Sequence, residues 1–180
     1  RFTVANEIGT ALCRAKRWDE TTMSCVASKG DLRLVQHMRA DGCPWNKVAI
    51  REAARGGHLP MVQWMHGAGC PIDETAIESA ANSGSLRLVQ WMCAAGCPID
   101  NAAIAAAARE GHQQLVQWMC GAGCPTDAST IAAAARNGYQ QLVEWLAENG
   151  CPIDATAIEL AAIGGHHQLV QWMHEHKFPH

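Results

Sequence analysis

The stretch LVQWMCAAGCPID at residues 88–100 decides the fold of this chain, because close copies recur before and after it. The cysteine of its Gly-Cys-Pro returns at a fixed interval of 27 residues. Self-similarity at this period is typical of a solenoid, in which each unit is too small to bury its own apolar face. The cysteines of this row are Cys43, Cys70, Cys97, Cys124 and Cys151.

Alignment on Cys-Pro divides residues 18–179 into six units of 27 residues, which we expect to form a single domain. Every unit has a Gly at the position of Gly84, and five of the six have a Trp at the position of Trp91. The units are 18–44, 45–71, 72–98, 99–125, 126–152 and 153–179.

Unit 72–98 contains the signals of two short helices. Asp73 is placed to cap the first helix, and the carboxylate or amide of an Asp or Asn stands at this position in every unit. An apolar stripe then follows at helical spacing, and Gly84 marks the end of that helix. A second stripe continues to Gly96 and Pro98, which stop the second helix. The stripes are Ile77, Ala80 and Ala81, then Leu88, Val89 and Met92.

The two ends of the chain depart from the repeat. In residues 1–17, Val4, Ile8 and Leu12 recur every fourth residue, which predicts an N-terminal capping helix. At residues 177–179, Lys-Phe-Pro replaces Gly-Cys-Pro, as expected of a terminal unit.

The second helix and the turn before it resemble the ankyrin repeat family. The family pattern A-A-x-x-G-H-x-x-x-V-x-x-L is matched by AARGGHLPMVQWM at 53–65, AAREGHQQLVQWM at 107–119 and AAIGGHHQLVQWM at 161–173. The family's Thr-Pro-Leu-His signature is missing, and each unit is about six residues shorter than the usual repeat. The resemblance therefore implies an all-α solenoid of stacked helix-turn-helix units without β-hairpins. It also implies a scaffold that binds a protein partner.

Composition narrows the possible partners. The formal net charge is −3, which gives no electrostatic reason to expect nucleic acid or an anionic membrane. No stretch is apolar enough to span a bilayer, and no signal peptide pattern is present. We expect an intracellular monomer that needs no cofactor. No nucleophile-elbow, P-loop, zincin or kinase motif occurs, so we do not expect an enzyme.

The nine cysteines admit two interpretations. Stacked helices lie about 8–10 Å apart, too far for disulfides along the Gly-Cys-Pro row, and free Cys is commonly a buried small residue. We therefore predict reduced, metal-free thiols that fill the core. The alternative is a metal- or redox-responsive protein that uses the Cys-x3-Cys pairs Cys93–Cys97 and Cys120–Cys124.

Histidine and tryptophan also repeat. His58, His112 and His166 stand where other units have Asp31 or Ser85, and this exchange favours a helix-capping role. A Trp ladder could stack nucleobases, but no basic groove accompanies it, so we predict that the Trp side chains pack against the next unit.

Positions that change from unit to unit are free for recognition. On the first helix these lie opposite the apolar stripe, where the central alanines at 105, 106, 132 and 133 would let a partner approach closely to Arg109 and Arg136. The candidate partner-binding residues are Arg51, Arg55, Glu78, Ser79, Asn82, Arg109 and Arg136.

Overall fold

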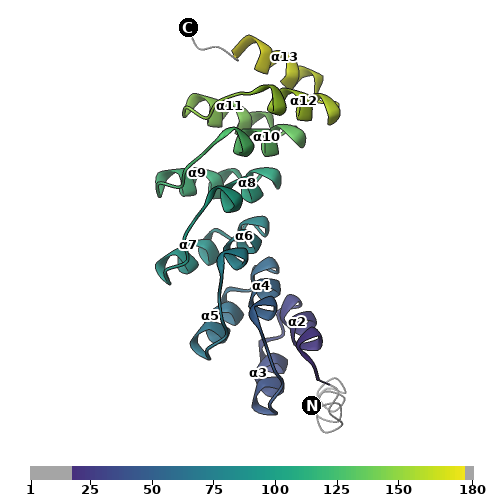
Figure 1. The fold of residues 1–180 in the computed structure, drawn as a ribbon, viewed down its shortest axis with the longest axis vertical. Coiled ribbons are helices and arrows are strands. Elements are labelled where there is room, and N and C mark those ends of the chain that lie inside the picture. Colours follow the sequence, from purple (N-terminus) through teal and green to yellow (C-terminus); the bar gives the residue numbers. More distant parts are fainter. Residues whose placement is uncertain (1–17, 177–180) are drawn as a thin grey trace. The chain divides into compact units, whose positions relative to one another are not determined.

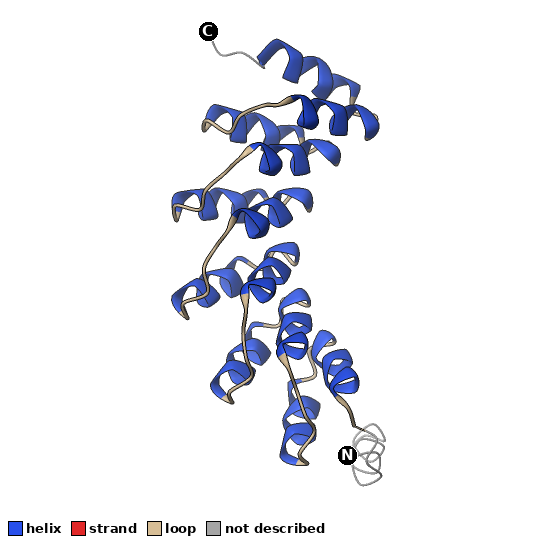
Figure 2. Ribbon diagram, in the orientation of Figure 1, coloured by secondary structure: helices blue, strands red, loops and turns tan. Residues whose placement is uncertain are grey.

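The computed structural model describes residues 18–176, which form twelve helices and no strand (Figures 1 and 2). The expectation of an all-α solenoid without β-hairpins is therefore confirmed over these residues. The predicted capping helix at 1–17 and the terminal Lys-Phe-Pro lie outside the described residues. The first helices of the units are α2 (Glu20–Ser28), α4 (Lys47–Arg55), α6 (Glu74–Asn82), α8 (Asn101–Arg109), α10 (Ala128–Arg136) and α12 (Ala155–Ile163). The second helices are α3 (Leu32–Ala40), α5 (Leu59–Gly67), α7 (Leu86–Ala94), α9 (Gln113–Gly121), α11 (Gln140–Glu148) and α13 (His167–His176).

The chain divides into two compact units, each of which stacks its own helices. In the first, α4 packs between α2 and α6, and in the second, α10 packs between α8 and α12. Each first helix also contacts the second helix that follows it, as in α4–α5 and α10–α11. The prediction that residues 18–179 form one domain stays a prediction.

The first helices begin where the Asp and Asn row predicts. Asp73 accepts a hydrogen bond from the backbone N–H of Thr75, and Asp127 accepts from those of Ser129 and Thr130. The hydroxyl of Ser129 also donates to Asp127, and these bonds lower the pKa of that carboxyl despite some desolvation. Asp19, Asn46, Asp100 and Asp154 cap their helices in the same way.

The cap residue of one unit is also linked to the start of the first helix in the unit before it. The ammonium of Lys47 lies 3.1 Å from the carboxylate of Asp73, and the amide of Asn101 donates to Asp127 at 2.9 Å. The amide of Asn46 likewise donates to Glu20. The same cap side chain therefore accepts a hydrogen bond from an unpaired backbone N–H of its own helix and links two neighbouring repeats.

The apolar stripes form the core, as predicted. Ile77, Ala80 and Ala81 of α6 are fully buried. Leu88, Val89 and Met92 of α7 are buried to the same degree. The buried residues of the first helices are mostly small alanines, which suits the close packing of first helix on first helix, and those of the second helices are mostly larger Leu, Val and Met.

The Gly-Cys-Pro cysteines are buried. Cys70 is 2% exposed, and its thiol donates to the backbone carbonyl of Asn46, the cap residue at the start of the same unit. Cys151 donates in the same way to the carbonyl of Asp127, with sulfur and oxygen 3.0 Å apart. The prediction of a buried small residue is therefore confirmed, and the thiol adds a hydrogen bond that an alanine would lack.

The histidines after the glycine row stand at helix-capping positions, as predicted, but their side chains do not make the cap bond. His58 and His112 are the N-cap residues of α5 and α9, and neither makes a side-chain cap hydrogen bond. Nε2 of His58 instead lies 3.1 Å from the carbonyl oxygen of Ser28, at the end of α2. His166 makes the same contact with the carbonyl of Arg136. The imidazole thus satisfies a helix C-terminus in the unit before its own.

The glycine row makes room for these rings. A Cβ added to Gly30 would lie 2.6 Å from Cε1 of His58, and one added to Gly138 would lie 2.5 Å from Cε1 of His166. Both glycines also have a positive φ, which L side chains rarely adopt. Glycine is needed here both for its backbone conformation and for the ring that packs on it.

Thr130 provides a test of how tightly this core is built. It is fully buried, its hydroxyl has no hydrogen-bond partner, and the matching position is alanine in four of the other five units (Ala49, Ala76, Ala103 and Ala157). Thr130→Val keeps the shape and removes the unpaired hydroxyl, so it should raise the free energy of unfolding by about 1 kcal/mol in chemical denaturation. Thr75→Val is the control and should lower it, because the Thr75 hydroxyl donates to Asp73 at 2.6 Å. A loss of stability in Thr130→Val would show that this hydroxyl has a partner.

Thiol burial predicts an order of chemical modification. Burial raises the pKa of both Cys70 and Cys151 to about 11, whereas Cys25 is exposed. At pH 8 a thiol of pKa 11 is only about one part in a thousand thiolate, the reactive form. Iodoacetamide should therefore modify Cys25 rapidly, and Cys70 and Cys151 only in denaturant, as peptide mapping by mass spectrometry would show. Equal rates at Cys25 and Cys70 in the native protein would contradict the buried row.

Candidate functional site

Arg51 and Arg55 lie on α4 and share one acidic neighbour. A guanidinium nitrogen of Arg51 is 3.3 Å from Oε1 of Glu52, and one of Arg55 is 3.9 Å from Oε2. The Arg55 side chain is 73% exposed and that of Arg51 is 39% exposed. Glu52 therefore offsets part of the positive charge here, and Arg55 is the more accessible of the two.

A shallow depression lies beside Arg55. It has a volume of about 300 Å³ and is lined by Ser28, Glu52, Arg55 and Gly56. Its lining combines one cation, one anion and one hydroxyl. This arrangement suits a polar contact on a protein surface better than an enclosed ligand.

The α6 candidates are less exposed than a helical wheel suggests. Glu78, Ser79 and Asn82 are all half-buried. The Ser79 hydroxyl donates to the carbonyl of Thr75 at 2.9 Å, within its own helix. Glu78 and Asn82 occupy the positions on α6 that Arg51 and Arg55 occupy on α4. The two helices pack together in the first compact unit.

Arg109 and Arg136 end α8 and α10, two helices that pack together in the second compact unit. Both residues are exposed. Nε of Arg109 lies 3.5 Å from Oε1 of Glu110, whose side chain is about as exposed as that of Arg109. Both arginines also stand in the last turn of their helices, where a cation is favoured by the helix dipole.

The alanines between these arginines were only partly placed correctly. Ala105 and Ala133 are half-buried, but Ala106 and Ala132 are only 2% and 5% exposed. The prediction that all four open the surface is therefore wrong for Ala106 and Ala132. They belong to the packing of the first helices, and the accessible alanine surface is narrower than expected.

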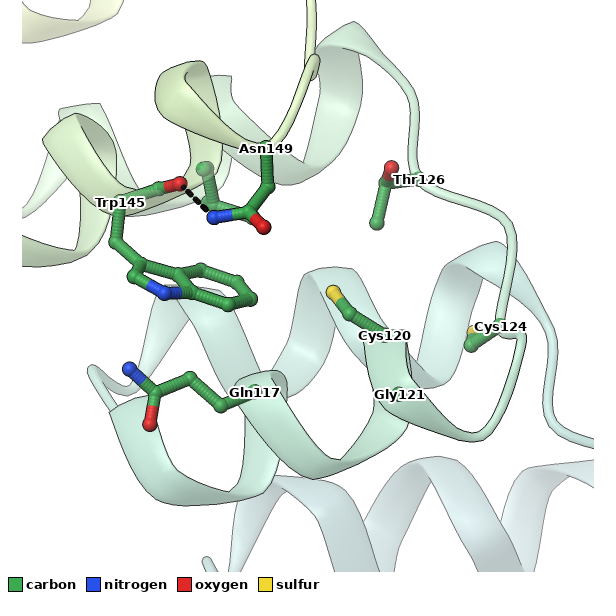
Figure 3. Close-up of a pocket in the computed structure, with 8 residues that line it drawn as sticks. Gln117, Cys120, Gly121, Cys124, Thr126, Trp145 and Asn149 are labelled. Atoms are coloured by element: carbon green, nitrogen blue, oxygen red, sulfur yellow. Dashed lines mark hydrogen bonds between the residues drawn. The ribbon is translucent and has the colours of Figure 1, made fainter.

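A hollow on the second helices was not predicted from the sequence. It lies between α9 and α11, has a volume of about 360 Å³, and is bordered by Cys120, Thr126 and Trp145 (Figure 3). Gln117 and Asn149 complete its polar rim, and the Asn149 amide donates to the carbonyl of Trp145 at 2.8 Å. The signal was present, because the row of Cys120 varies among units as strongly as the first-helix rows.

Trp145 borders this hollow, and the Trp residues of its row are not among the buried core residues. Trp64, Trp91, Trp118, Trp145 and Trp172 are each half-buried. Contact with neighbouring groups is seen at Trp91, whose ring meets that of His66 edge-on at 5.6 Å between centroids. This ring therefore packs against the unit before its own, whereas the prediction was the next unit, and part of each indole stays accessible.

The cysteine pairs show no metal-binding geometry within residues 18–176, where no three His, Cys, Asp or Glu side chains lie close enough to hold an ion. Burial raises the pKa of the Cys93 thiol, and the neighbouring Cys97 thiol raises it further. Burial also raises the pKa of Cys120. Proton loss, which metal binding and oxidation both require, is thus disfavoured at these thiols.

Among the described helices, none is both long and apolar enough to cross a bilayer.

Comparison with known proteins identifies the repeat. A family model described as ankyrin repeats (3 copies) matches residues 50–130. A search of curated protein sequences gave no significant match. Among solved structures, the ankyrin repeat domain of human ASB11 superposes with a TM-score of 0.71 at 17% sequence identity, covering 87% of this chain and 84% of that chain. At this identity the likeness shows the fold, and ankyrin repeats are general protein–protein interaction modules. Residues 50–130 therefore carry recognisable ankyrin repeats, and the chain as a whole has the fold of an ankyrin repeat domain.

Proposed function

We propose that this protein is a non-catalytic, monomeric scaffold that binds a protein partner through the variable face of its first helices. The observation that carries this proposal is the pair Arg109 and Arg136, exposed at the ends of two helices that pack together. Arg51, Arg55, Glu78, Ser79 and Asn82 make the corresponding contacts in the first compact unit. We place the protein inside the cell, where reduced thiols persist.

The chemistry of the pair favours an acidic segment of the partner. A guanidinium presents planar donors that match a carboxylate, and charge-assisted hydrogen bonds of this kind are stronger than neutral ones. Glu110 neutralises part of the charge at Arg109, so Arg136 is expected to contribute the larger share of the binding energy. The half-buried Ala105 and Ala133 add no side chain that would keep a partner at a distance.

Helix stability is the competing explanation for these arginines. A cation in the last turn stabilises a helix by about 0.3–1 kcal/mol through the dipole, without any partner. The two roles differ in what a charge reversal does. A purely structural arginine changes stability alone, whereas a binding arginine changes affinity by far more than stability.

The test is the double substitution Arg109→Glu with Arg136→Glu. The partner is first captured from the native source with the wild-type protein and identified, and its affinity for both forms is then measured by calorimetry. An anchor arginine is commonly worth about 2 kcal/mol or more, so affinity should fall at least tenfold. Thermal unfolding should show a loss of no more than about 1 kcal/mol per site.

The matched control places acidic residues on the second helices instead. Gln114→Glu with Gln141→Glu changes two exposed side chains of α9 and α11 and should leave affinity unchanged. If the glutamine pair abolishes binding while the arginine pair does not, the first-helix assignment is wrong.

A further inference from the structure

The hollow between α9 and α11 has a counterpart in the first compact unit that is filled by the chain itself. Two repeats before Cys120 and Trp145 stand His66 and Trp91. The imidazole of His66 meets the Trp91 indole at an angle of 80°, an edge-to-face contact. The chain thus shows which kind of group packs against a tryptophan of this row.

A second counterpart lies between α3 and α5. There Trp45 stands where the hollow has Thr126, and its ring meets that of Trp64 edge-on at 5.6 Å. Arg39 stands where the hollow has Cys120, and its guanidinium lies 4.5 Å from the centre of the Trp45 ring. Planar groups therefore occupy this region both between α3 and α5 and between α5 and α7 of the first compact unit.

Between α9 and α11 of the second compact unit, the same region holds short side chains. Cys120 and Thr126 do not reach across to Trp145, and a hollow of about 360 Å³ remains between them (Figure 3). A Cβ added at the adjoining Gly121 would meet nothing within 4 Å. The volume lies within the range of small ligand clefts, about 300–1,000 Å³.

The lining specifies an uncharged, hydrogen-bonding occupant. Its polar groups are the amides of Gln117 and Asn149, the hydroxyl of Thr126 and the thiol of Cys120. The amide nitrogen of Asn149 is already engaged with the Trp145 carbonyl, which leaves its oxygen facing other groups. Trp145 offers an accessible indole against which a ring can pack.

We propose that this hollow is a binding site for a planar, imidazole-like side chain presented by a partner protein. The inserted ring packs against Trp145 as His66 packs against Trp91, and the amide rim bonds to its nitrogens. The site lies on the second helices and is separate from the first-helix face. Its test needs no partner, so its failure would leave the first-helix proposal unaffected.

The probe is imidazole at pH 8, where the ring is neutral, titrated into the full chain. The readout is the indole N–H signal of Trp145 in NMR spectra, assigned by its loss in Trp145→Phe. This signal should shift in a saturable way with a dissociation constant on the order of millimolar, as suits so small a ligand. The signals of Trp64 and Trp91 should stay in place, because the chain's own rings already pack there.

Two variants close the hollow from within. Cys120→His copies His66 and Thr126→Trp copies Trp45, so each should weaken imidazole binding at least tenfold while circular dichroism shows an intact fold. Gln141→His places the same ring on an exposed position of α11 and should leave binding unchanged.

Three results would overturn the assignment. The first is a shift of the Trp145 signal that never saturates. The second is an equal effect of piperidine, a saturated ring that cannot pack as an aromatic group does. The third is tighter binding of cytidine than of imidazole, which would identify a nucleobase site in place of a protein side chain.

Discussion

The structure depends on one constraint, which is that a unit of 27 residues cannot bury its own apolar face. Each unit has two helices of about nine residues, and isolated helices of that length are marginal in water. Ile77 and Ala81 are fully buried only because α6 has α4 beside it, and Ile131 and Ala135 are buried because α10 lies between α8 and α12. Stability in such an array comes from the interfaces between neighbours, so residues at those interfaces repeat while the remainder vary.

Polar links also hold the array together, the thiols within one unit and the imidazoles between neighbouring units. A thiol such as Cys151 bonds to a cap carbonyl 24 residues earlier, and an imidazole such as His166 bonds to a helix-end carbonyl 30 residues earlier. The imidazole satisfies a carbonyl that a short helix leaves unpaired at its C-terminus, whereas the thiol adds a second donor to a cap carbonyl that already accepts the backbone N–H of Thr130. Because these helices are so short, their unpaired ends are a large share of the backbone. The repeated His and Gly therefore serve the interfaces between units, and the repeated Cys links the end of each unit to its own first cap.

Local signals explain how much of this could be predicted. Asp73 as a cap, the stripe at Ile77 and the turn at Gly84 all act within one helix, so spacing alone was sufficient. The role of His58 was mispredicted because its partner, the Ser28 carbonyl, belongs to another unit. Ala106 and Ala132 were mispredicted because a helical wheel does not show how closely the next helix packs. The hollow at Trp145 was missed because it depends on small side chains in two different units. The proposed partner contacts come from positions that vary from repeat to repeat, because packing between units does not determine which residue stands there.

The most direct test of this account is the helix content of one unit removed from its neighbours. A synthetic peptide of residues 99–125 contains both α8 and α9 with all their caps, and its sequence is rich in alanine, a strong helix former. Circular dichroism of the peptide is compared with that of the full chain during heating. We predict a largely unstructured peptide without a cooperative transition, while the full chain unfolds cooperatively. A folded peptide with its own sharp melting transition would contradict the claim that stacking between units holds the fold together.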